Sequence, residues 1–436
     1  MSLREDADKI IKEAIRKVLP DEAVAAALNR KLADGSFKVS HKGRILVVSI
    51  GKAGWQMARA AYDTLGSKIS GGVVVTKYDH VRGEIPGFTC YEAGHPVPDE
   101  NSFKATQAAI DLVTGLTADD LVIFLVSGGG SALFEKPLVS GEELADVTSK
   151  LLACGADIVE MNTIRKRLSA VKGGKFARLC HPARVYSIVL SDIIGDPLDM
   201  IASGPAYPDS SSAEDALRII DKYNIRLSDE AKALMRVETP KALDNVETEV
   251  TGSVRNLCRA AADEASRLGY EPVILTDQLT CQAREAGDFL AAIARTHATK
   301  ISEDADAAGR PVSVDAEQIH HTRRAFIAGG ETVVHLTGKG KGGRNQELAL
   351  AAAEGIAGLD NVCVFSVGSD GTDGPTDAAG GYADGYTKEK LQVQGISIYE
   401  VLKENDAYNA LKKTDGLVIT GPTGTNVNDF AAVLIG

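Results

Sequence analysis

Short apolar runs that end in glycine-rich turns recur along the whole chain. Because these runs are continuous and not alternating, they predict strands buried on both faces, as in parallel sheets. Helical stripes lie between them, as in the spacing of Ala58, Ala61 and Leu65. Strand alternating with helix predicts an α/β protein with mostly parallel sheets. The runs are "ILVVSIGKAG", "GGVVVTKY", "LVIFLVSGGGS", "YSIVLSDIIGD", "EPVILTD", "AFIAGGET", "VCVFSVGSDG" and "LVITGPTG".

The length of 436 residues predicts two domains, because one ordinary core does not grow this large. The polar segment Asp221–Glu249 interrupts the strand–helix rhythm and carries Pro240. We therefore expect domains at residues 1–240 and 241–436. The acidic stretch at 300–321 is interpreted as a surface loop of the second domain. Ligands of open α/β sheets lie beyond the carboxyl ends of strands, so the cleft between the domains is the expected site.

Composition and charge exclude several classes of protein. A chain with 44% hydrophobic and 25% charged residues is typical of a soluble globular protein. The net charge of −12 argues against nucleic-acid binding, and no apolar run approaches the ~20 residues of a membrane span. Six scattered cysteines without a CxxC pair favour reduced thiols, and the charged N-terminus is not a signal peptide. The expected compartment is the cytoplasm.

The segment "VSIGKAGWQMA" resembles a dinucleotide-binding turn with Ser49 in place of its first glycine. An NAD site also needs an acid at the end of the next strand, and that strand ends in Thr76 and Lys77. Gly51 and Lys52 instead open a helix, where backbone N–H groups and a lysine suit phosphate. The alternative is an ordinary exposed lysine at a helix start.

A second turn, "VSGGGSALF", follows a strand of six apolar residues. Successive glycines allow the backbone to fold around a ligand and to present N–H donors, which suits a phosphate or a carboxylate. The alternative is simply a tight strand-to-helix turn. The candidate residues of this turn are Ser127, Gly128, Gly129, Gly130 and Ser131.

A basic run without any acid extends from Met161 to Ser191. Arg165 and Lys172 lie two turns apart and are candidates for the floor of an anion site, whereas most of the run is interpreted as a solvated helix face. Asp192 follows at a strand end, where it could bind a metal ion or a substrate hydroxyl, or cap the next turn.

The glycine-richest stretch is "AGGETVVHLTGKGKGGRNQELAL". Ordering so many glycines is costly, which predicts a mobile loop that becomes ordered over an anionic ligand. Arg344 can bind a phosphate with two N–H groups, which lysine cannot. The alternative is a flexible surface hairpin. Glu331, Asn345 and Glu347 are candidates in the same stretch.

Three aspartates lie close together in "SDGTDGPTDAAGG". Asp370, Asp373 and Asp377 are open to three interpretations: a metal site, a substrate clamp or a solvated turn. The histidines, including His95, show neither a catalytic-triad pattern nor metal-ligand spacing.

Seven segments taken together resemble the glycerate 2-kinase family with its C-terminal MOFRL domain. They are "SIGKAG", "GHPVPDENS", "SGGGSALF", "MNTIRKRLSAVKGGK", "LSDIIGDPLDMIASGP", "GGETVVHLTGKGKGGRNQELAL" and "SVGSDGTDGPTDAAG". The resemblance implies a cytosolic kinase that transfers the γ-phosphoryl group of ATP to the 2-hydroxyl of D-glycerate. It also implies a Rossmann-like N-terminal domain, and Lys52 and Arg344 as the catalytic pair.

Phosphoryl transfer requires cations and precise positioning, and ATP brings Mg²⁺, which prefers carboxylates. We expect Asp370 or Asp373 to hold Mg²⁺ or a substrate hydroxyl, with Asp192 as a further candidate ligand. The expected substrate- and nucleotide-binding residues are Gly51, Ser127, Gly128, Gly129, Gly130, Ser131, Arg165, Lys172, Asp192, Glu331, Asn345, Glu347 and Asp370.

Two other functions remain open from the sequence. One is a hydroxypyruvate or tartronate reductase that uses NAD(P)H, and the other is a non-catalytic sugar-acid binding protein. The sequence leaves open whether the chain is a monomer or a homodimer.

Overall fold

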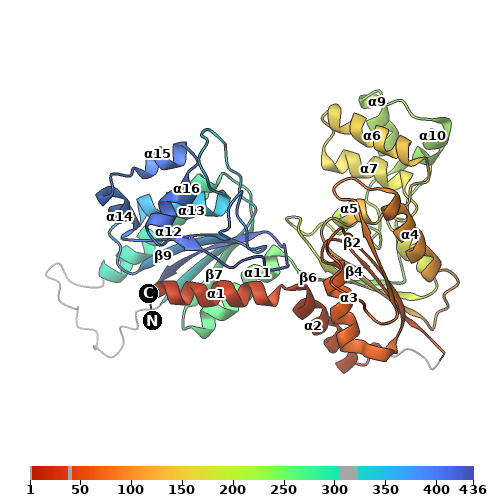
Figure 1. Ribbon diagram of the computed structural model, residues 1–436, viewed down its shortest axis with the longest axis horizontal. Helices are drawn as coiled ribbons and strands as arrows, with labels where there is room; N and C mark the ends of the chain where they lie inside the picture. The colour runs from red at the N-terminus through yellow and green to blue at the C-terminus, as the bar shows by residue number, and fades with distance from the viewer. Residues whose placement is uncertain (1, 38–41, 304–322) are drawn as a thin grey trace. The chain divides into compact units, whose positions relative to one another are not determined.

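A computed structural model describes residues 2–37, 42–303 and 323–436. It divides into two compact units (Figure 1). The N-terminal unit is Pro20–Thr251, and the C-terminal unit combines Gly252–Gly436 with Met1–Leu19. Of the acidic stretch predicted as a loop, residues 300–303 end a helix and 304–321 lie outside the described residues.

The predicted boundary at residue 240 is too early, because β6 (Val246–Gly252) adds a strand to the first sheet. The first helix, α1 (Leu3–Lys17), belongs to the C-terminal unit, which the sequence did not predict. Its Asp6 carboxylate accepts a hydrogen bond from the Tyr270 hydroxyl at 3.0 Å. The apolar face of α1 is buried as well, so this helix completes a core assembled from the far end of the chain.

The sheet of the N-terminal unit has the order β3-β2-β1-β4-β5-β6, and its first five strands run parallel. Alternate residues of β1 face two different cores. Ile45 and Val47 pack with α2 and α3, whereas Val48 and Ile50 pack with α4 and the helices beyond it. Two apolar faces are therefore required, as the continuous run predicted, and the one polar residue, Ser49, is buried with its hydroxyl donating to the Gly54 carbonyl at 2.6 Å. The elements are α2 (Pro20–Ala33), β1 (Ile45–Ile50), α3 (Gly54–Leu65), η1 (Gly66–Lys68), β2 (Ile69–Lys77), β3 (Phe88–Ala93), α4 (Glu100–Leu112), β4 (Leu121–Val126), α5 (Gly130–Leu133), α8 (Lys175–Cys180), β5 (Arg184–Leu190) and η2 (Ile201–Ser203).

A small helical cluster with its own apolar core adjoins this sheet, drawn in yellow and green in Figure 1. Each of its four helices begins at a side-chain cap that accepts a hydrogen bond from an amide of the first turn. The capping residues are Ser140, Asp157, Ser212 and Ser228. The helices are α6 (Gly141–Ala153), α7 (Ile158–Leu168), α9 (Ala213–Lys222) and α10 (Asp229–Met235).

The sheet of the C-terminal unit has the order β11-β10-β9-β12-β8-β7. Only β7 and β8 pair in parallel among the pairs described; the others are antiparallel, so the prediction of mostly parallel sheets is wrong for this unit. The α/β class is confirmed. The elements are α11 (Val254–Arg267), β7 (Glu271–Leu279), α12 (Ala283–Glu303), β8 (Arg324–Gly330), α13 (Arg344–Gly355), β9 (Val362–Gly368), β10 (Gly380–Asp384), α14 (Thr387–Val393), α15 (Ile398–Lys403), α16 (Ala407–Lys413), β11 (Leu417–Val418) and β12 (Asp429–Ile435).

Within the described residues, no helix combines the length and the apolar character that crossing a membrane requires.

Candidate functional site

In the N-terminal unit, the turns that follow β1 and β4 are joined to one another. The Lys52 amide donates to the Gly128 carbonyl at 2.8 Å, and the Ala53 amide donates to the Ser127 hydroxyl at 3.1 Å. Gly51 has a φ of +104°, and a Cβ atom there would lie 2.3 Å from the Ser127 carbonyl oxygen. This close approach requires glycine, and the two predicted turns therefore form one structure at the carboxyl edge of the sheet.

The Lys52 side chain is exposed, and among the described residues its ammonium has no hydrogen bond or ion pair. It lies beside His95, which sequence reasoning did not assign to the site. A Cβ atom at Gly129 would lie 3.0 Å from the His95 ring and 3.3 Å from Lys52 Cγ. Burial, followed by the charges of Lys52 and Lys77, lowers the pKa of His95. The shift favours the neutral form of the imidazole beside a cation.

Asp192 reaches the same turn from the end of β5. A Cβ atom at Gly128 would lie 2.3 Å from its Oδ2 atom, so the carboxylate rests against the glycine backbone. The structure thus brings Lys52, His95 and Asp192 to one pair of glycine turns. A cation, a neutral imidazole and a carboxylate side by side can bind an anionic group and a hydroxyl together.

Arg165 and Lys172 converge on the back of this turn and not on an open surface. Both donate to the Ser131 carbonyl, at 2.9 Å and 2.8 Å, and Lys172 also donates to the Phe134 carbonyl at 3.0 Å. Lys172 is fully buried with Glu135 at 3.1 Å, and burial lowers its pKa to about 8. The structure assigns Lys172 to the interior, where it holds the turn in place, and not to a ligand-binding surface.

The basic run as a whole is not the solvated helix face that the sequence predicted. Lys166 and Arg167 are buried, and Lys166 pairs with Asp209 at 2.9 Å. The acids that pair with them lie more than 30 residues away along the chain. A count of charges within the segment therefore could not predict these ion pairs. Ser131 also has a partner far along the chain, because its hydroxyl forms a hydrogen bond of 3.1 Å with the Ser203 hydroxyl.

In the C-terminal unit, Arg344 begins α13 and is held by two acids. Its Nε and NH2 groups donate to Asp429 at 2.5 Å and 3.2 Å, and NH1 donates to Glu331 at 2.7 Å. Burial acts to lower the pKa of Arg344, but the hydrogen bonds that it donates to Asp429 raise it. Burial raises the pKa of Asp429 to about 6 in spite of the arginine. Sequence reasoning missed Asp429, which directly precedes the apolar run 430–435.

The three loop aspartates have three different environments. Asp373 is buried and caps α13: its carboxylate accepts from the amides of Asn345 at 3.2 Å and Gln346 at 2.8 Å. Burial raises the pKa of Asp373. Asp377 accepts from the Tyr408 hydroxyl at 2.7 Å. Asp370 is half-buried, and the one hydrogen bond described for its carboxylate comes from the Thr372 amide at 2.9 Å.

The described residues contain no group of three or more acidic, histidine or cysteine side chains that could hold a metal ion. The predicted ligand Asp373 already accepts with both carboxylate oxygens from helix amides. Mg²⁺, however, is commonly held by one or two carboxylates together with substrate phosphates. Asp370 fits that limited role, whereas Asp373 does not.

The glycine-rich loop before Arg344 is docked and not free, contrary to the prediction of a mobile loop. Asn405 accepts from the amides of Thr337 and Gly338 at 2.8 Å each, and the Gly340 amide donates to the Glu404 carbonyl at 2.8 Å. A Cβ atom at Gly338 would lie 2.3 Å from the Glu404 backbone. The glycines therefore permit the loop to pack against the chain before α16.

Asn345 and Glu347 are buried beside this loop. Asn345 accepts from the Ser366 hydroxyl at 2.6 Å, so it ties α13 to β9. Glu347 accepts from Asn405 at 3.2 Å, and burial raises its pKa.

A pocket of about 710 Å³ opens beside Arg344 in the C-terminal unit. Its lining includes Glu347, Asp370 and Asp373, so the structure brings these predicted residues together. Glu331 and Asn345 are not part of the lining, but each bonds to a residue that is: Glu331 accepts from Arg344 at 2.7 Å, and Asn345 donates to Asp373 at 3.4 Å.

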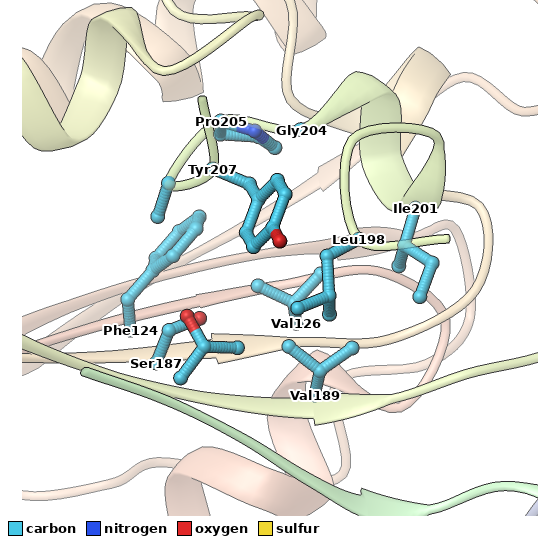
Figure 2. A pocket seen from close by; sticks show the side chains of 11 residues that line it. Phe124, Val126, Ser187, Val189, Leu198, Ile201, Gly204, Pro205 and Tyr207 are labelled. Carbon is cyan, nitrogen blue, oxygen red and sulfur yellow. The ribbon is translucent and has the colours of Figure 1, made fainter. Parts of the chain in front are cut away.

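A much smaller cavity of about 20 Å³ lies in the N-terminal unit, where Figure 2 shows Val126 and Val189 directed toward Tyr207. It has room for about one water molecule and not for a substrate.

Comparison with known proteins gives the family. Residues 324–429 match the MOFRL family, and residues 6–236 match a domain of unknown function, DUF4147. A protein of Thermotoga maritima named D-glycerate 2-kinase is 51% identical over 436 residues, which cover 100% of this chain and 99% of the relative. The chain belongs to the glycerate kinase family.

Another family member, from Agrobacterium vitis, is 41% identical over 90% of this chain and 100% of its own length, and it carries a provisional name as a hydroxypyruvate reductase. A crystal structure of glycerate kinase from Thermotoga maritima superposes with a TM-score of 0.87 at 50% identity, over 100% of this chain and 99% of that chain.

Proposed function

We propose that this protein is a glycerate 2-kinase, which transfers the γ-phosphoryl group of ATP to the 2-hydroxyl of D-glycerate and releases 2-phospho-D-glycerate and ADP. The observation that carries the proposal is 51% identity to a D-glycerate 2-kinase across the whole chain. The geometry supports it independently, because each unit presents a cation at a glycine-rich turn. Phosphoryl transfer depends mainly on such positioned charges.

In the N-terminal unit, Lys52 supplies a positive charge to the oxygens of the transferred group. Its ammonium is exposed and has no anionic partner among the described residues, so binding an anion breaks no existing ion pair. The Gly51 and Gly128 turns hold the lysine backbone, and Asp192 lies against the same turn, within reach of a substrate hydroxyl. Arg165 acts indirectly, by fixing Ser131.

In the C-terminal unit, Arg344 stabilises the charge that spreads over the phosphoryl oxygens. A guanidinium has five N–H donors, and the acids Asp429 and Glu331 occupy three. Two donors remain for one or two oxygens of the reacting group. The acids also prevent rotation of the guanidinium, so those donors are oriented before the substrate arrives.

Asp370 would hold Mg²⁺ together with the phosphates of ATP, and the ion would neutralise phosphate charge during transfer. This role matches the position of Asp370 on the lining of the pocket beside Arg344 and the single hydrogen bond described for its carboxylate.

A reductase is the alternative function. It would need a nicotinamide site with an acid at the end of β2 to hold the ribose, and the chain has Thr76 and Lys77 there. Thr76 is buried and donates to the Lys52 carbonyl at 3.2 Å, so it is occupied within the fold.

One experiment separates the two functions. The protein is incubated with D-glycerate, ATP and Mg²⁺, or with hydroxypyruvate and NADH, and ADP release and NADH oxidation are followed. We expect ADP release only, and phosphorus NMR of the product should show the phosphate ester on carbon 2. Oxidation of NADH without ADP release would overturn the proposal, and an ester on carbon 3 would overturn its regiochemistry.

A further inference from the structure

We propose that the base and ribose of the nucleotide bind in the C-terminal unit, in the pocket formed by the segment Thr332–Gly338 and the loop 370–375. This inference rests on the proposed kinase function and adds to it the binding site of one of the two substrates. The acid substrate then belongs to the glycine turns around Lys52 in the N-terminal unit.

The size of the pocket is the first argument. At about 710 Å³ it lies within the range of about 300–1,000 Å³ that is usual for sites of drug-sized ligands and cofactors. A three-carbon acid would leave most of this volume filled with water. A nucleotide matches it.

The apolar lining is the second argument. Leu336 is 79% exposed and Val333 is 54% exposed, and both line the pocket together with Val334 and Pro375. Single exposed apolar side chains are ordinary, but several around one concave site indicate a ligand with apolar faces. D-glycerate carries a carboxylate and two hydroxyls and has no such face. The flat faces of a purine do.

The apolar wall is fixed before any ligand binds. Asn405 accepts from the amides of Thr337 and Gly338, and its Nδ2 group donates to the His335 carbonyl at 3.2 Å. At the other end of the segment, the Val333 amide donates to the Cys281 carbonyl at 3.1 Å. A preformed wall costs less ordering entropy on binding than a free loop does.

The charges of the lining agree with a nucleotide whose phosphates point toward α13. Arg344, Lys339 and Asp370 all line the pocket, and the loop that carries Asp370 packs against the glycine-rich loop, so phosphates bound there would meet two cations and a carboxylate for their Mg²⁺. The remaining acids of the lining, Glu347 and Asp373, already accept hydrogen bonds from Asn405 and from helix amides. The apolar side chains of the lining therefore suit the base, and its charged side chains suit the phosphates.

The test compares Leu336→Ser with wild type. Leu336 is largely exposed, so its replacement should leave the melting temperature unchanged. We expect the KM for ATP and the Kd of a fluorescent N-methylanthraniloyl-ADP to rise by about 10-fold or more, since each lost apolar contact in a pocket reduces binding by about that factor. The KM for D-glycerate should stay within about 2-fold.

Val393→Ser is the matched control, because Val393 is 83% exposed in the same unit, on α14, and does not line the pocket. It should change neither constant. If Leu336→Ser leaves both nucleotide constants unchanged, or raises only the KM for D-glycerate, the assignment is overturned. Labelled ADP binding is measured without the acid, so it tests this assignment even if wild type fails to phosphorylate D-glycerate and the proposed function falls.

Discussion

The two cations that we propose for catalysis are held in different ways. Lys52 extends from a turn built of backbone hydrogen bonds, and its ammonium has no anionic partner in the described part of the chain. Arg344 is clamped by Asp429 and Glu331 with three of its five N–H donors. The lysine therefore offers an unpaired charge on a side chain that extends from a hydrogen-bonded turn. The arginine offers a guanidinium whose orientation is fixed by two acids.

This difference predicts different consequences of removing each cation. Loss of Lys52 removes a charge and leaves the fold unaffected. Loss of Arg344 removes an oriented pair of donors and also leaves Asp429, which is buried, without its counter-ion. The following variants test that contrast.

Arg344→Ala should have the largest effect on turnover, a loss of about 10³–10⁵, as for arginines that stabilise charge in other phosphoryl-transfer enzymes. Nucleotide binding should weaken far less, because the transition state carries the charge that the fork recognises. Arg344→Lys should recover little, since it keeps the charge and loses the paired donors. Steady-state turnover and the Kd of ADP measure these effects.

The control for stability is the double variant Arg344→Ala with Asp429→Asn, which removes the buried charge together with its partner. It should regain much of the melting temperature lost by Arg344→Ala and none of the turnover. A lysine variant with nearly wild-type turnover would show that Arg344 acts only as a point charge.

Lys52→Ala should lower turnover by about 10²–10³, the value of one well-placed transition-state donor, without a change in melting temperature. Lys68→Ala provides the control, because Lys68 is also exposed and follows the opposite end of α3. If Lys52→Ala turns over at the wild-type rate, Lys52 has no catalytic role and is an ordinary exposed lysine at a helix start.

How far the sequence predicted the fold depended on whether the information was local. Continuous apolar strands such as 45–50 and 121–126 predicted the first parallel sheet, with its turns at one edge. The same pattern in β9 and β12 could not reveal that they run antiparallel, because an apolar run carries no sign of direction. Likewise, nothing near Asp6 indicates that Tyr270 is its partner.

For the candidate site, too, local features of the sequence were predictive and contacts between distant residues were not. Lys52, Gly128 and Asp192 were predicted from strand ends, and the structure places them together. Asp429 was missed because it lies 85 residues beyond Arg344. The burial of Lys172 with Glu135 was not predicted, because a count of local charges does not show which cations are buried with a partner.

Lys172→Met tests that reassignment through stability. The substitution leaves the buried Glu135 without its ion-pair partner and should lower the free energy of unfolding by about 3–5 kcal/mol. The double variant Lys172→Met with Glu135→Leu should regain most of the lost free energy of unfolding. Chemical denaturation measures both. A stable Lys172→Met protein with a greatly raised KM for D-glycerate would return Lys172 to the binding site.

The loop aspartates should give the smallest and most graded effects. Asp370→Asn should lower turnover by about 10- to 100-fold, the range of one charge-assisted contact, and should raise the Mg²⁺ concentration needed for half-maximal rate. Asp373→Asn weakens the cap of α13 and should cost about 1 kcal/mol of stability with a smaller effect on turnover. Asp377→Asn loses only a bond to Tyr408 at an exposed site and should stay within about 2-fold of wild type. Mg²⁺ titrations and melting temperatures of the three variants separate these roles. If all three turn over at nearly the wild-type rate, the segment is a solvated turn and the magnesium role of Asp370 is wrong.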